Sequence, residues 1–333
     1  MPERLSEKEK KTLVTGAGGF IGSHVVEQLL EMDYAVVCLL KYGENPRWIS
    51  NLPVKFIEGD LRDTDSLNRS VQNIPMVIHL AGRLGGWSDP SSIHEVNLNG
   101  TKNLFRAFRE YGKNQRRFLF VSSLAAAGGT PSTGIYDETR PPAPFSAYGR
   151  SKLSCEKYLL KQDIPSTIVR LPIVYGPRSF RGLYPIFKIG AKGIELSMKK
   201  VSTVVGYVED IARGIIQAAE SPVTAGQIYY LGEDCVYSSA DICSAISGIQ
   251  NRRMMKIHLP YPVLYSAASL MEVFAKLRKK NPLLWRRNLT EYLNRHYRYS
   301  MKKARRDFGY KSHVPLNEGV GLTADWYRRH HHV

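Results

Sequence analysis

The sequence predicts an α/β fold with a doubly wound parallel sheet, because three features of its first half occur together. Short apolar runs alternate with segments of helical period over residues 12–175, as in successive βα units. A glycine-rich turn joins the first run to the first helical segment, and several later runs end in small or polar residues. With 333 residues and 43% hydrophobic composition, the chain can bury this sheet and a smaller lobe.

The glycine-rich turn lies between the first expected strand and the first expected helix. Gly16 permits a tight turn, and the next two glycines let backbone N–H groups approach a diphosphate. Gly22 lets the helix lie close to the strand, and the positive end of that helix points at the phosphates. A purely structural turn is the alternative, but the repeated βα pattern favours a Rossmann-type dinucleotide-binding fold. The expected cradle residues are Gly16, Gly18, Gly19, Phe20, Ile21 and Gly22.

The other elements follow in order along the chain. Right-handed crossovers would place the C-terminal ends of all strands at one edge of the sheet, where open α/β sheets bind ligands. The expected strands are Thr12–Thr15, Ala35–Leu39, Val54–Glu58, Met76–Leu80, Phe118–Ser122 and Thr167–Arg170, and the expected helices include Phe20–Leu30, Asn97–Tyr111 and Ala147–Lys161.

The alternation loosens after Pro177 and returns at Val204–Ala219 and Gln227–Leu231. We therefore expect a Rossmann NAD(P)-binding domain over residues 1–177, with returns to its sheet near 203–232. A smaller, interleaved C-terminal substrate-binding lobe would comprise residues 178–202 and 233–333.

Three positions suggest how the adenosine end of a dinucleotide is held. Leu40 and Lys41 stand where many NAD-binding folds place an acidic residue for the ribose 2′-hydroxyl. Lys41, together with Arg47, would instead favour a 2′-phosphate, so we favour NADP over NAD. Asp60, followed by Leu61, comes after the third strand and could accept a hydrogen bond from the adenine amino group. N-capping of the next helix by Asp60 or Asp63 explains this segment equally well.

The fourth strand ends in small residues, Leu80, Ala81 and Gly82, which suit a backbone lying against a ribose. We interpret His79 before them as a packed histidine rather than a catalyst. Asn97 begins the next expected helix, where N-capping explains it without any function. Its place at the same edge leaves an active-site role open.

Ser123, Tyr148 and Lys152 form the sharpest chemical pattern. Tyr148 and Lys152 are four residues apart on an expected helix and share one of its faces. A free tyrosine titrates near pH 10, and an adjacent ammonium group favours the phenolate. Lys152 would tune Tyr148 and hold a cofactor ribose, while the Ser123 hydroxyl at a strand end would bond the reacting oxygen.

The Tyr-x-x-x-Lys spacing alone is weak, since Tyr184/Lys188 and Tyr299/Lys303 repeat it. Tyr184 precedes a proline, and Tyr299 lies in a basic run far from the βα units. Only Tyr148 has a strand-end serine some 25 residues upstream.

Together these residues resemble the extended short-chain dehydrogenase/reductase family, also called the NAD-dependent epimerase/dehydratase family. The resemblance implies a bound nicotinamide cofactor, a catalytic Ser123, Tyr148 and Lys152 set with Asn97 nearby, and nicotinamide contacts from the segment that includes Pro172 and Val174. It also favours a homodimer built on the helices of residues 97–111 and 147–161. The matching segments are Thr15–Gly22, Gly59–Asp63, His79–Ala81, Asn97–Thr101, Ser122–Ser123, Tyr148–Lys152, Arg170–Pro177 and Val208–Asp210.

Departures from the family pattern help to choose within it. Leu124 and Ala125 replace the Asp-Glu pair that follows the catalytic hydroxyl residue in sugar-nucleotide dehydratases, which argues against dehydration. Thr203 replaces the arginine that pairs with the substrate diphosphate in sugar-nucleotide epimerases, and Ala127 replaces their tyrosine. The pocket looks more like those of the dihydroflavonol-reductase and 3β-hydroxysteroid-dehydrogenase branches. The epimerase alternative stays open because a second group of cations could bind a diphosphate: Arg178, Arg181, Lys199 and Lys200.

The composition of the chain limits its expected cellular compartment and binding partners. The charged N-terminus lacks an apolar stretch of signal-peptide length, so we expect a cytoplasmic protein. We interpret the four cysteines, Cys38, Cys155, Cys235 and Cys243, as small buried hydrophobes, and we expect no metal site, His330–His332 being too short a run.

The positive charge is concentrated at the C-terminal end. Residues 251–333 hold 18 lysines and arginines and five acidic residues, whereas residues 1–250 hold 29 and 25. Within this quarter, Tyr292, Tyr297 and Tyr299 interleave with arginines as a nucleic-acid surface would, but no nucleic-acid fold motif accompanies them.

Residues 259–280 predict a helix with one apolar face. The ordinary interpretation is a substrate-lobe helix packed on the core through that face. The sharper one is a peripheral membrane contact through residues 259–298, with the cations after the helix at anionic headgroups. Glu272 and two prolines argue against a membrane span of about 20 residues. The face comprises Val263, Ala267, Leu270, Met271, Phe274 and Leu277.

The leading hypothesis is therefore an NAD(P)-dependent oxidoreductase that transfers hydride between the cofactor and a secondary alcohol or ketone, on an apolar or lipid-like substrate. The alternative is a sugar-nucleotide 4-epimerase with tightly bound NAD. A non-catalytic nucleotide-binding or membrane-associated protein is a third possibility, which the complete Ser-Tyr-Lys set argues against.

Overall fold

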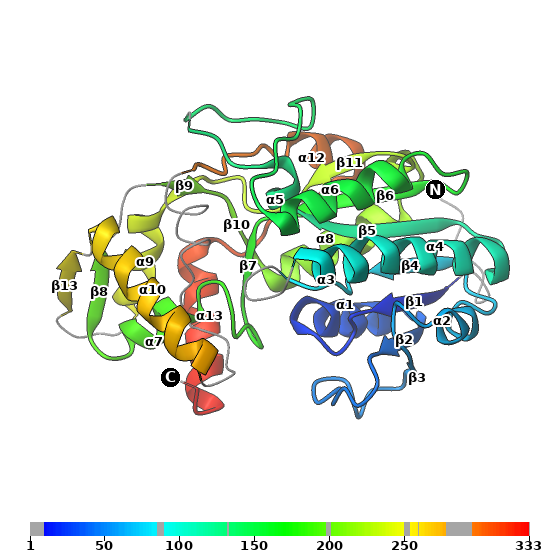
Figure 1. Cartoon of the computed structure of the whole chain (residues 1–333), viewed down its shortest axis with the longest axis horizontal. Helices are drawn as coiled ribbons and strands as arrows, with labels where there is room; N and C mark the ends of the chain where they lie inside the picture. The colour runs from blue at the N-terminus through cyan, green and yellow to red at the C-terminus, as the bar shows by residue number, and fades with distance from the viewer. Residues whose placement is uncertain are drawn as a thin grey trace.

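A seven-stranded parallel sheet forms the centre of the chain (Figure 1). The computed structural model describes residues 10–84, 90–131, 133–197, 201–249, 254–258, 260–277 and 295–332. The strand order is β11-β6-β5-β4-β1-β2-β3, so the direction of winding reverses between β1 and β4. The strands are β1 (Lys11–Thr15), β2 (Ala35–Leu40), β3 (Lys55–Glu58), β4 (Met76–His79), β5 (Arg117–Ser123), β6 (Ser166–Leu171) and β11 (Ile228–Tyr230).

Helices cover both faces of the sheet because successive strand residues point to opposite sides. Val14 belongs to the core beneath α1 and α8, whereas Leu13 belongs to the core beneath α2, α4 and α6. The predicted doubly wound α/β architecture is thereby confirmed. The helices are α1 (Phe20–Glu31), α2 (Thr64–Ser70), α3 (Pro90–His94), α4 (Gly100–Tyr111), α5 (Leu124–Ala127), α6 (Ala147–Leu159) and α8 (Val208–Glu220), with a 3-10 turn at Pro222–Thr224.

The expected elements agree with the structure to within a few residues, and one difference bears on the site. The segment that starts at Asn97 is a π-helical turn, Glu95–Asn99, which passes directly into α4. The predicted return at Gln227–Leu231 is β11, which pairs with β6 at the edge of the sheet.

A second group of elements lies at the left of Figure 1, around a third core. Tyr175, Tyr207 and Tyr327 are among its largest fully buried side chains. Its short strands pair two by two: β7 (Ile173–Tyr175) with β10 (Val205–Tyr207), β8 (Ile194–Ser197) with β13 (Met255–His258), and β9 (Ser202–Thr203) with β12 (Tyr237–Ser238). Its helices are α7 (Tyr184–Gly190), α9 (Ser239–Gly248), α10 (Tyr261–Leu277) and α13 (Leu316–Arg329).

The chain returns to the main sheet after this lobe. Helix α12 (Lys302–Phe308) packs near β11, and Tyr297 and Tyr299 are buried in the core beneath α1 and α8. Burial removes these two tyrosines from any nucleic-acid stacking surface, and Tyr292 lies outside the described residues. The division into domains and the homodimer stay predictions.

Two sequence-based predictions about burial are wrong. Cys38, Cys155 and Cys243 are buried, but Cys235 is exposed because it lies in the loop between β11 and β12. The orientation of α10 is reversed as well. Its small Ala268 and Ala275 face inward, whereas Val263, Leu270 and Phe274 are more than half exposed. Residues seven apart share one side of a helix, so the two buried alanines mark the inner side of α10; the Leu277 side chain lies outside the described ones.

Candidate active site

The glycine-rich turn has the geometry of a phosphate cradle. Gly16 has φ +70°, a backbone conformation that favours glycine. The N–H of Gly19 donates to the Gly16 carbonyl at 3.1 Å. A Cβ on Gly22 would lie 2.1 Å from the Gly16 oxygen, so no other residue lets α1 approach β1 this closely. Helix α1 starts without a side-chain cap and without an acidic residue in its first turn. Its free N–H groups suit a diphosphate.

A cleft of about 590 Å³ extends from this turn past the C-terminal ends of β1, β4 and β5. It brings together most of the predicted site residues. Those that line it are Gly16, Gly18, Gly19, Phe20, Ile21, Gly22, Leu80, Gly82, Ser123, Tyr148, Lys152, Pro172 and Val174. The other five, Lys41, Asp60, Leu61, Ala81 and Asn97, do not line it.

Strand β5 and helix α6 form one wall of this cleft, which we call the catalytic wall. Ser123 ends β5, and its Oγ accepts the N–H of Ala125 at 3.2 Å, which caps the short helix α5. Tyr148 and Lys152 face the cleft from α6, as their spacing predicts. A serine hydroxyl, a phenol and an amine therefore meet beside the dinucleotide cradle.

Lys152 is held inside the protein. Its Nζ donates to the Val121 carbonyl at 2.8 Å and lies 6.0 Å from the centre of the Tyr148 ring. A Cβ on Gly82 would lie 3.4 Å from the same Nζ, an ordinary van der Waals contact, and 3.3 Å from Asn97 Oδ1. Burial lowers the pKa of Lys152 from 10.5 to about 8. The amine can thus exchange a proton near neutral pH.

A buried ion pair behind the catalytic wall escaped the sequence analysis. Arg170 on β6 donates from Nε and Nη2 to the Glu156 carboxylate on α6, at 3.0 and 2.6 Å. Ser122 on β5 donates to the same carboxylate, and Tyr230 accepts from Arg170 at 2.9 Å. These bonds tie α6 to β5, β6 and β11. A charged residue in an otherwise apolar strand and a glutamate four residues after Lys152 were the available signals.

Asn97 is a positioning residue rather than a helix cap. Its Oδ1 accepts the Arg83 N–H at 2.6 Å, and its Nδ2 donates to the Arg83 carbonyl and to Ser151 Oγ. The capping alternative is wrong, because Asn97 lies inside the π-helical turn and makes no cap bond. It joins the loop after β4 to α6, behind the cleft.

His79 is a packed histidine, as interpreted from the sequence. It is fully buried between Thr15 Oγ1, at 2.7 Å, and Thr101 Oγ1, at 3.0 Å. Burial lowers its pKa to about 3, and the charge of Lys152 adds to the shift. The ring is therefore neutral at physiological pH and does not line the cleft.

The other two Tyr-x-x-x-Lys pairs lie elsewhere. Tyr299 is buried and donates to the Gly128 carbonyl, and Tyr184 packs against Tyr327 in the lobe. Neither tyrosine lines the cleft.

Comparisons with known proteins agree with this geometry. Residues 12–232 match the NAD dependent epimerase/dehydratase family. The chain belongs to this family. It is an NAD-dependent dehydrogenase, reductase or epimerase of the extended short-chain type.

Three relatives span nearly the whole chain. Mouse sterol-4-alpha-carboxylate 3-dehydrogenase, decarboxylating, is 27% identical over 98% of this chain and 92% of its own length. The 2-alkyl-3-oxoalkanoate reductase of Shewanella oneidensis is 23% identical over 96% of this chain and 86% of its own length. The structure of Thermus thermophilus UDP-glucose 4-epimerase with NAD matches with a TM-score of 0.76 and 26% identity, over 96% of this chain and 99% of that one.

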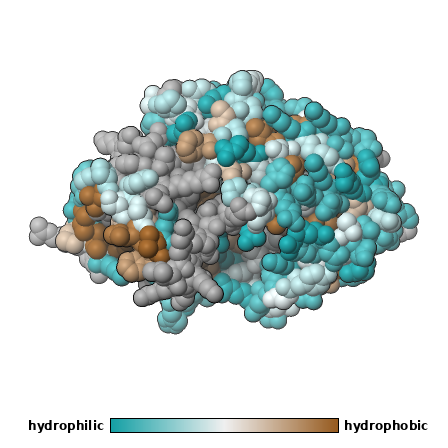
Figure 2. Space-filling model, in the orientation of Figure 1, coloured by the Kyte–Doolittle hydropathy of each residue, from teal (hydrophilic) through white to brown (hydrophobic). Residues whose placement is uncertain are grey.

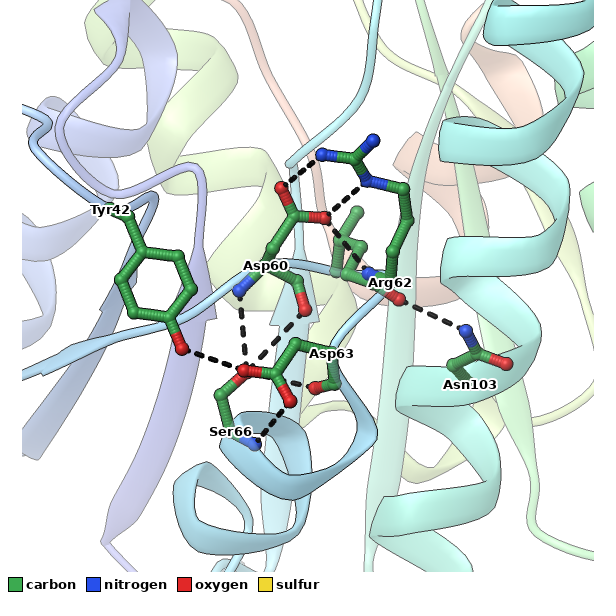
Figure 3. Close-up of polar contacts among 7 residues, drawn as sticks. Tyr42, Asp60, Arg62, Asp63, Ser66 and Asn103 are labelled. Carbon is green, nitrogen blue, oxygen red and sulfur yellow. Dashed lines mark hydrogen bonds and ion pairs between the residues drawn. The ribbon is translucent and has the colours of Figure 1, made fainter.

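Asp60, which sequence reasoning placed against adenine, is already bonded in this family member. Its carboxylate accepts the backbone N–H, Nε and Nη2 of Arg62 at 2.8 to 2.9 Å (Figure 3). The Arg62 hydrogen bonds hold the pKa of Asp60 at about 2. Asp63 caps α2 by accepting from Asp65 and Ser66, as the alternative interpretation predicted. Asn103 donates to the Leu61 carbonyl at 3.1 Å, which fixes the turn in place.

The end of β2 differs from the sequence-based expectation. Glu44, which the sequence analysis did not consider, turns back so that its Oε2 accepts the Lys41 N–H at 3.0 Å. A Cβ on Gly18 would lie 2.6 Å from Glu44 Oε1. Arg47 is stacked on Trp48 and Phe180, with its guanidinium carbon 4.3 and 5.2 Å from their ring centres. A carboxylate, rather than a cation, therefore lies against the glycine turn.

The far side of the cleft combines aromatic and aliphatic side chains with arginines, and sequence reasoning missed most of its apolar part. Arg178, one of the cations considered for a diphosphate, forms a bidentate ion pair with Glu27 at 2.7 and 2.9 Å. Arg181 lines the cleft, and Lys199 and Lys200 lie outside the described residues. These side chains come from loops distant in sequence, so no local motif marks them. The residues not predicted as site residues that line this side include Trp48, Leu84, Ile173, Phe180, Thr203 and Tyr297.

Two properties of the described residues bear on membranes and metals. None of their helices is long and apolar enough to cross a membrane. No group of three or more histidine, cysteine, aspartate or glutamate side chains among them is placed to hold a metal ion.

Proposed function

We propose that this protein is an oxidoreductase that transfers hydride between a nicotinamide dinucleotide and a secondary alcohol or ketone, on an apolar or lipid-like substrate. The observation that carries the proposal is the catalytic wall. Ser123, Tyr148 and Lys152 line one cleft with an uncapped helix N-terminus at its other end. The residues fit a dinucleotide because the glycine turn presents backbone without Cβ atoms beside the uncapped N-terminus of α1.

The bound nicotinamide would supply the hydride in reduction and accept it in oxidation. Tyr148 donates the proton to the substrate oxygen in the reductive direction. Ser123 holds that oxygen by a hydrogen bond. Lys152 places positive charge behind the phenol and favours its ionised form as the proton leaves, which a buried amine does better than one in water.

The lining of the cleft supports an apolar substrate. Trp48, Leu84 and Phe180 supply rings and an alkyl chain to this lining, beside the polar side chains of Arg47, Arg178 and Arg181. The names of two relatives point the same way, since one acts on a sterol carboxylate and the other on a 2-alkyl-3-oxoalkanoate.

A sugar-nucleotide 4-epimerase is the second candidate. Arg181 at the cleft favours it, as does the likeness to a UDP-glucose 4-epimerase. Against it, Arg178 is paired with Glu27, and Thr203 lies in the cleft where the epimerase pattern has an arginine.

For the cofactor we propose NAD rather than the NADP that Lys41 and Arg47 suggested. Glu44 lies against Gly18 at the end of β2, which is the region where Rossmann folds bind the adenosine ribose. A carboxylate there accepts hydrogen bonds from a ribose diol and repels a 2′-phosphate. Arg47, which also lines the cleft, is stacked on the rings of Trp48 and Phe180.

The test of the activity is Tyr148→Phe, with Tyr184→Phe as the matched control from the lobe. Steady-state turnover is measured with NADH on a panel of cyclic ketones, long-chain ketones and 3-oxo acids. NADH affinity is measured by isothermal titration. We expect Tyr148→Phe to lower turnover by about 10²–10⁴-fold with NADH affinity nearly unchanged, because only the proton donor is lost. Tyr184→Phe should behave as wild type.

Undiminished turnover in Tyr148→Phe would overturn the assignment. A wild-type protein that reduces none of the panel, keeps NAD through purification and interconverts UDP-glucose and UDP-galactose would establish the epimerase instead.

A further inference from the structure

Helix α10 carries an apolar surface that nothing in the described structure covers. Val263, Leu270, Val273 and Phe274 are 53–61% exposed. They recur at intervals of three, four and seven residues, so they lie along one side of the helix. We call this set the outer face of α10. Figure 2 shows it as the brown patch at the left, where Figure 1 places α10.

The inner side of the same helix is buried and carries small side chains. Ala268 is fully buried and Ala275 nearly so. The helix thus buries two of its alanines and exposes its large Leu270 and Phe274 side chains. Folding of the lobe does not explain why these side chains are large and apolar, since they stay more than half exposed after folding. Contiguous exposed apolar surface of this kind marks an interaction site.

Charge indicates what this surface meets. Residues 252–298, which contain α10, hold 11 lysines and arginines and two acidic residues. Arg278, Lys279 and Lys280 follow directly on the last residue of α10 in the sequence. An apolar face next to a cationic segment is complementary to a lipid surface that offers hydrocarbon beneath anionic headgroups.

We infer that the outer face of α10 docks this protein on bilayers that contain anionic phospholipid, with the helix lying in the interface. A 17-residue helix is about 25 Å long and too short to span the bilayer. A second copy of the chain fits the surface less well, because two equally cationic segments would repel each other. The inference stands apart from the proposed reaction and does not depend on it.

The test uses the full chain in vesicle co-sedimentation, with phosphatidylcholine vesicles that contain or lack phosphatidylserine. The variant is Leu270→Ser with Phe274→Ser. The matched control is Ile135→Ser with Val223→Ser, which removes two equally exposed apolar side chains outside α10. We expect wild type and control to bind phosphatidylserine vesicles at least about tenfold more tightly than phosphatidylcholine alone. The α10 variant should lose about tenfold or more of that affinity.

Several outcomes would overturn the inference. Wild type that ignores phosphatidylserine vesicles would do so, as would an α10 variant that binds them like wild type, since charge alone would then suffice. A dimer in sedimentation velocity that becomes a monomer only in the α10 variant, without vesicle binding by wild type, would assign the face to a second copy. Equal thermal midpoints of the two double variants and wild type establish that all are folded.

Discussion

Helices α6 and α10 depart in opposite ways from the usual burial of apolar side chains and exposure of charged ones. On α6 the charged Lys152 and Glu156 are inside the protein, each with a hydrogen-bond partner. On α10 the large Leu270 and Phe274 are outside, and an alanine is inside. Both arrangements cost free energy, since buried charge must be paired and exposed apolar surface orders water. Each departure from the ordinary pattern therefore marks a place where the protein does something besides fold.

The comparison also separates two kinds of functional surface. The catalytic wall is held by bonds that cross from α6 to three strands, so its geometry exists before any ligand arrives. The outer face of α10 consists of apolar side chains that make no such bonds. Its proposed role requires only that these side chains be exposed on one side of the helix. For the protein in buffer, substitutions in the catalytic wall should therefore lower the free energy of unfolding strongly. Substitutions on the outer face of α10 should change it little.

The largest expected effect comes from Glu156→Ala. It leaves the Arg170 guanidinium buried without its carboxylate, and breaking a buried pair in this way costs about 3–5 kcal/mol. Urea unfolding measures this loss as a drop in the free energy of unfolding. Asp325→Ala removes the partner of Arg328 in a surface pair and should cost less than about 1 kcal/mol.

Equal losses in Glu156→Ala and Asp325→Ala would contradict this account of the catalytic wall. They would mean that water reaches Arg170 and that the pair does not join α6 to the sheet.

Sequence patterns predicted the sheet and the Ser123, Tyr148 and Lys152 set because both depend on spacing along one or two elements. A residue four positions along a helix shares its face whatever surrounds it. Glu44 and the Glu156–Arg170 pair could not be found in this way, since each depends on how separate elements meet. The apolar period of α10 was visible in the sequence, but a period does not say whether the protein or something else covers the face.

Glu44→Gln is expected to have an intermediate effect. The amide keeps the shape of the side chain and loses the charge that lies against Gly18. We expect the ratio of NADPH to NADH affinity to rise about tenfold, equal to about 1.4 kcal/mol. Isothermal titration of both cofactors gives the ratio directly.

Glu31→Gln, at the far end of α1, is the control for the change in net charge and should leave the ratio unaltered. If wild type binds NADPH and NADH with equal affinity, Glu44 does not select between the two cofactors. Binding of neither cofactor would instead count against the proposed reaction.

The smallest expected effect is that of Leu270→Ala on the protein in solution. A leucine that is 61% exposed loses few contacts on truncation, so the free energy of unfolding should change by less than about 0.5 kcal/mol. A buried leucine would cost about 2–5 kcal/mol, and a loss of that size would show that this face packs inward as the sequence first suggested. A near-silent substitution in buffer that weakens vesicle binding would mean that the side chain serves a surface outside the fold, which is the distinction between α10 and the catalytic wall.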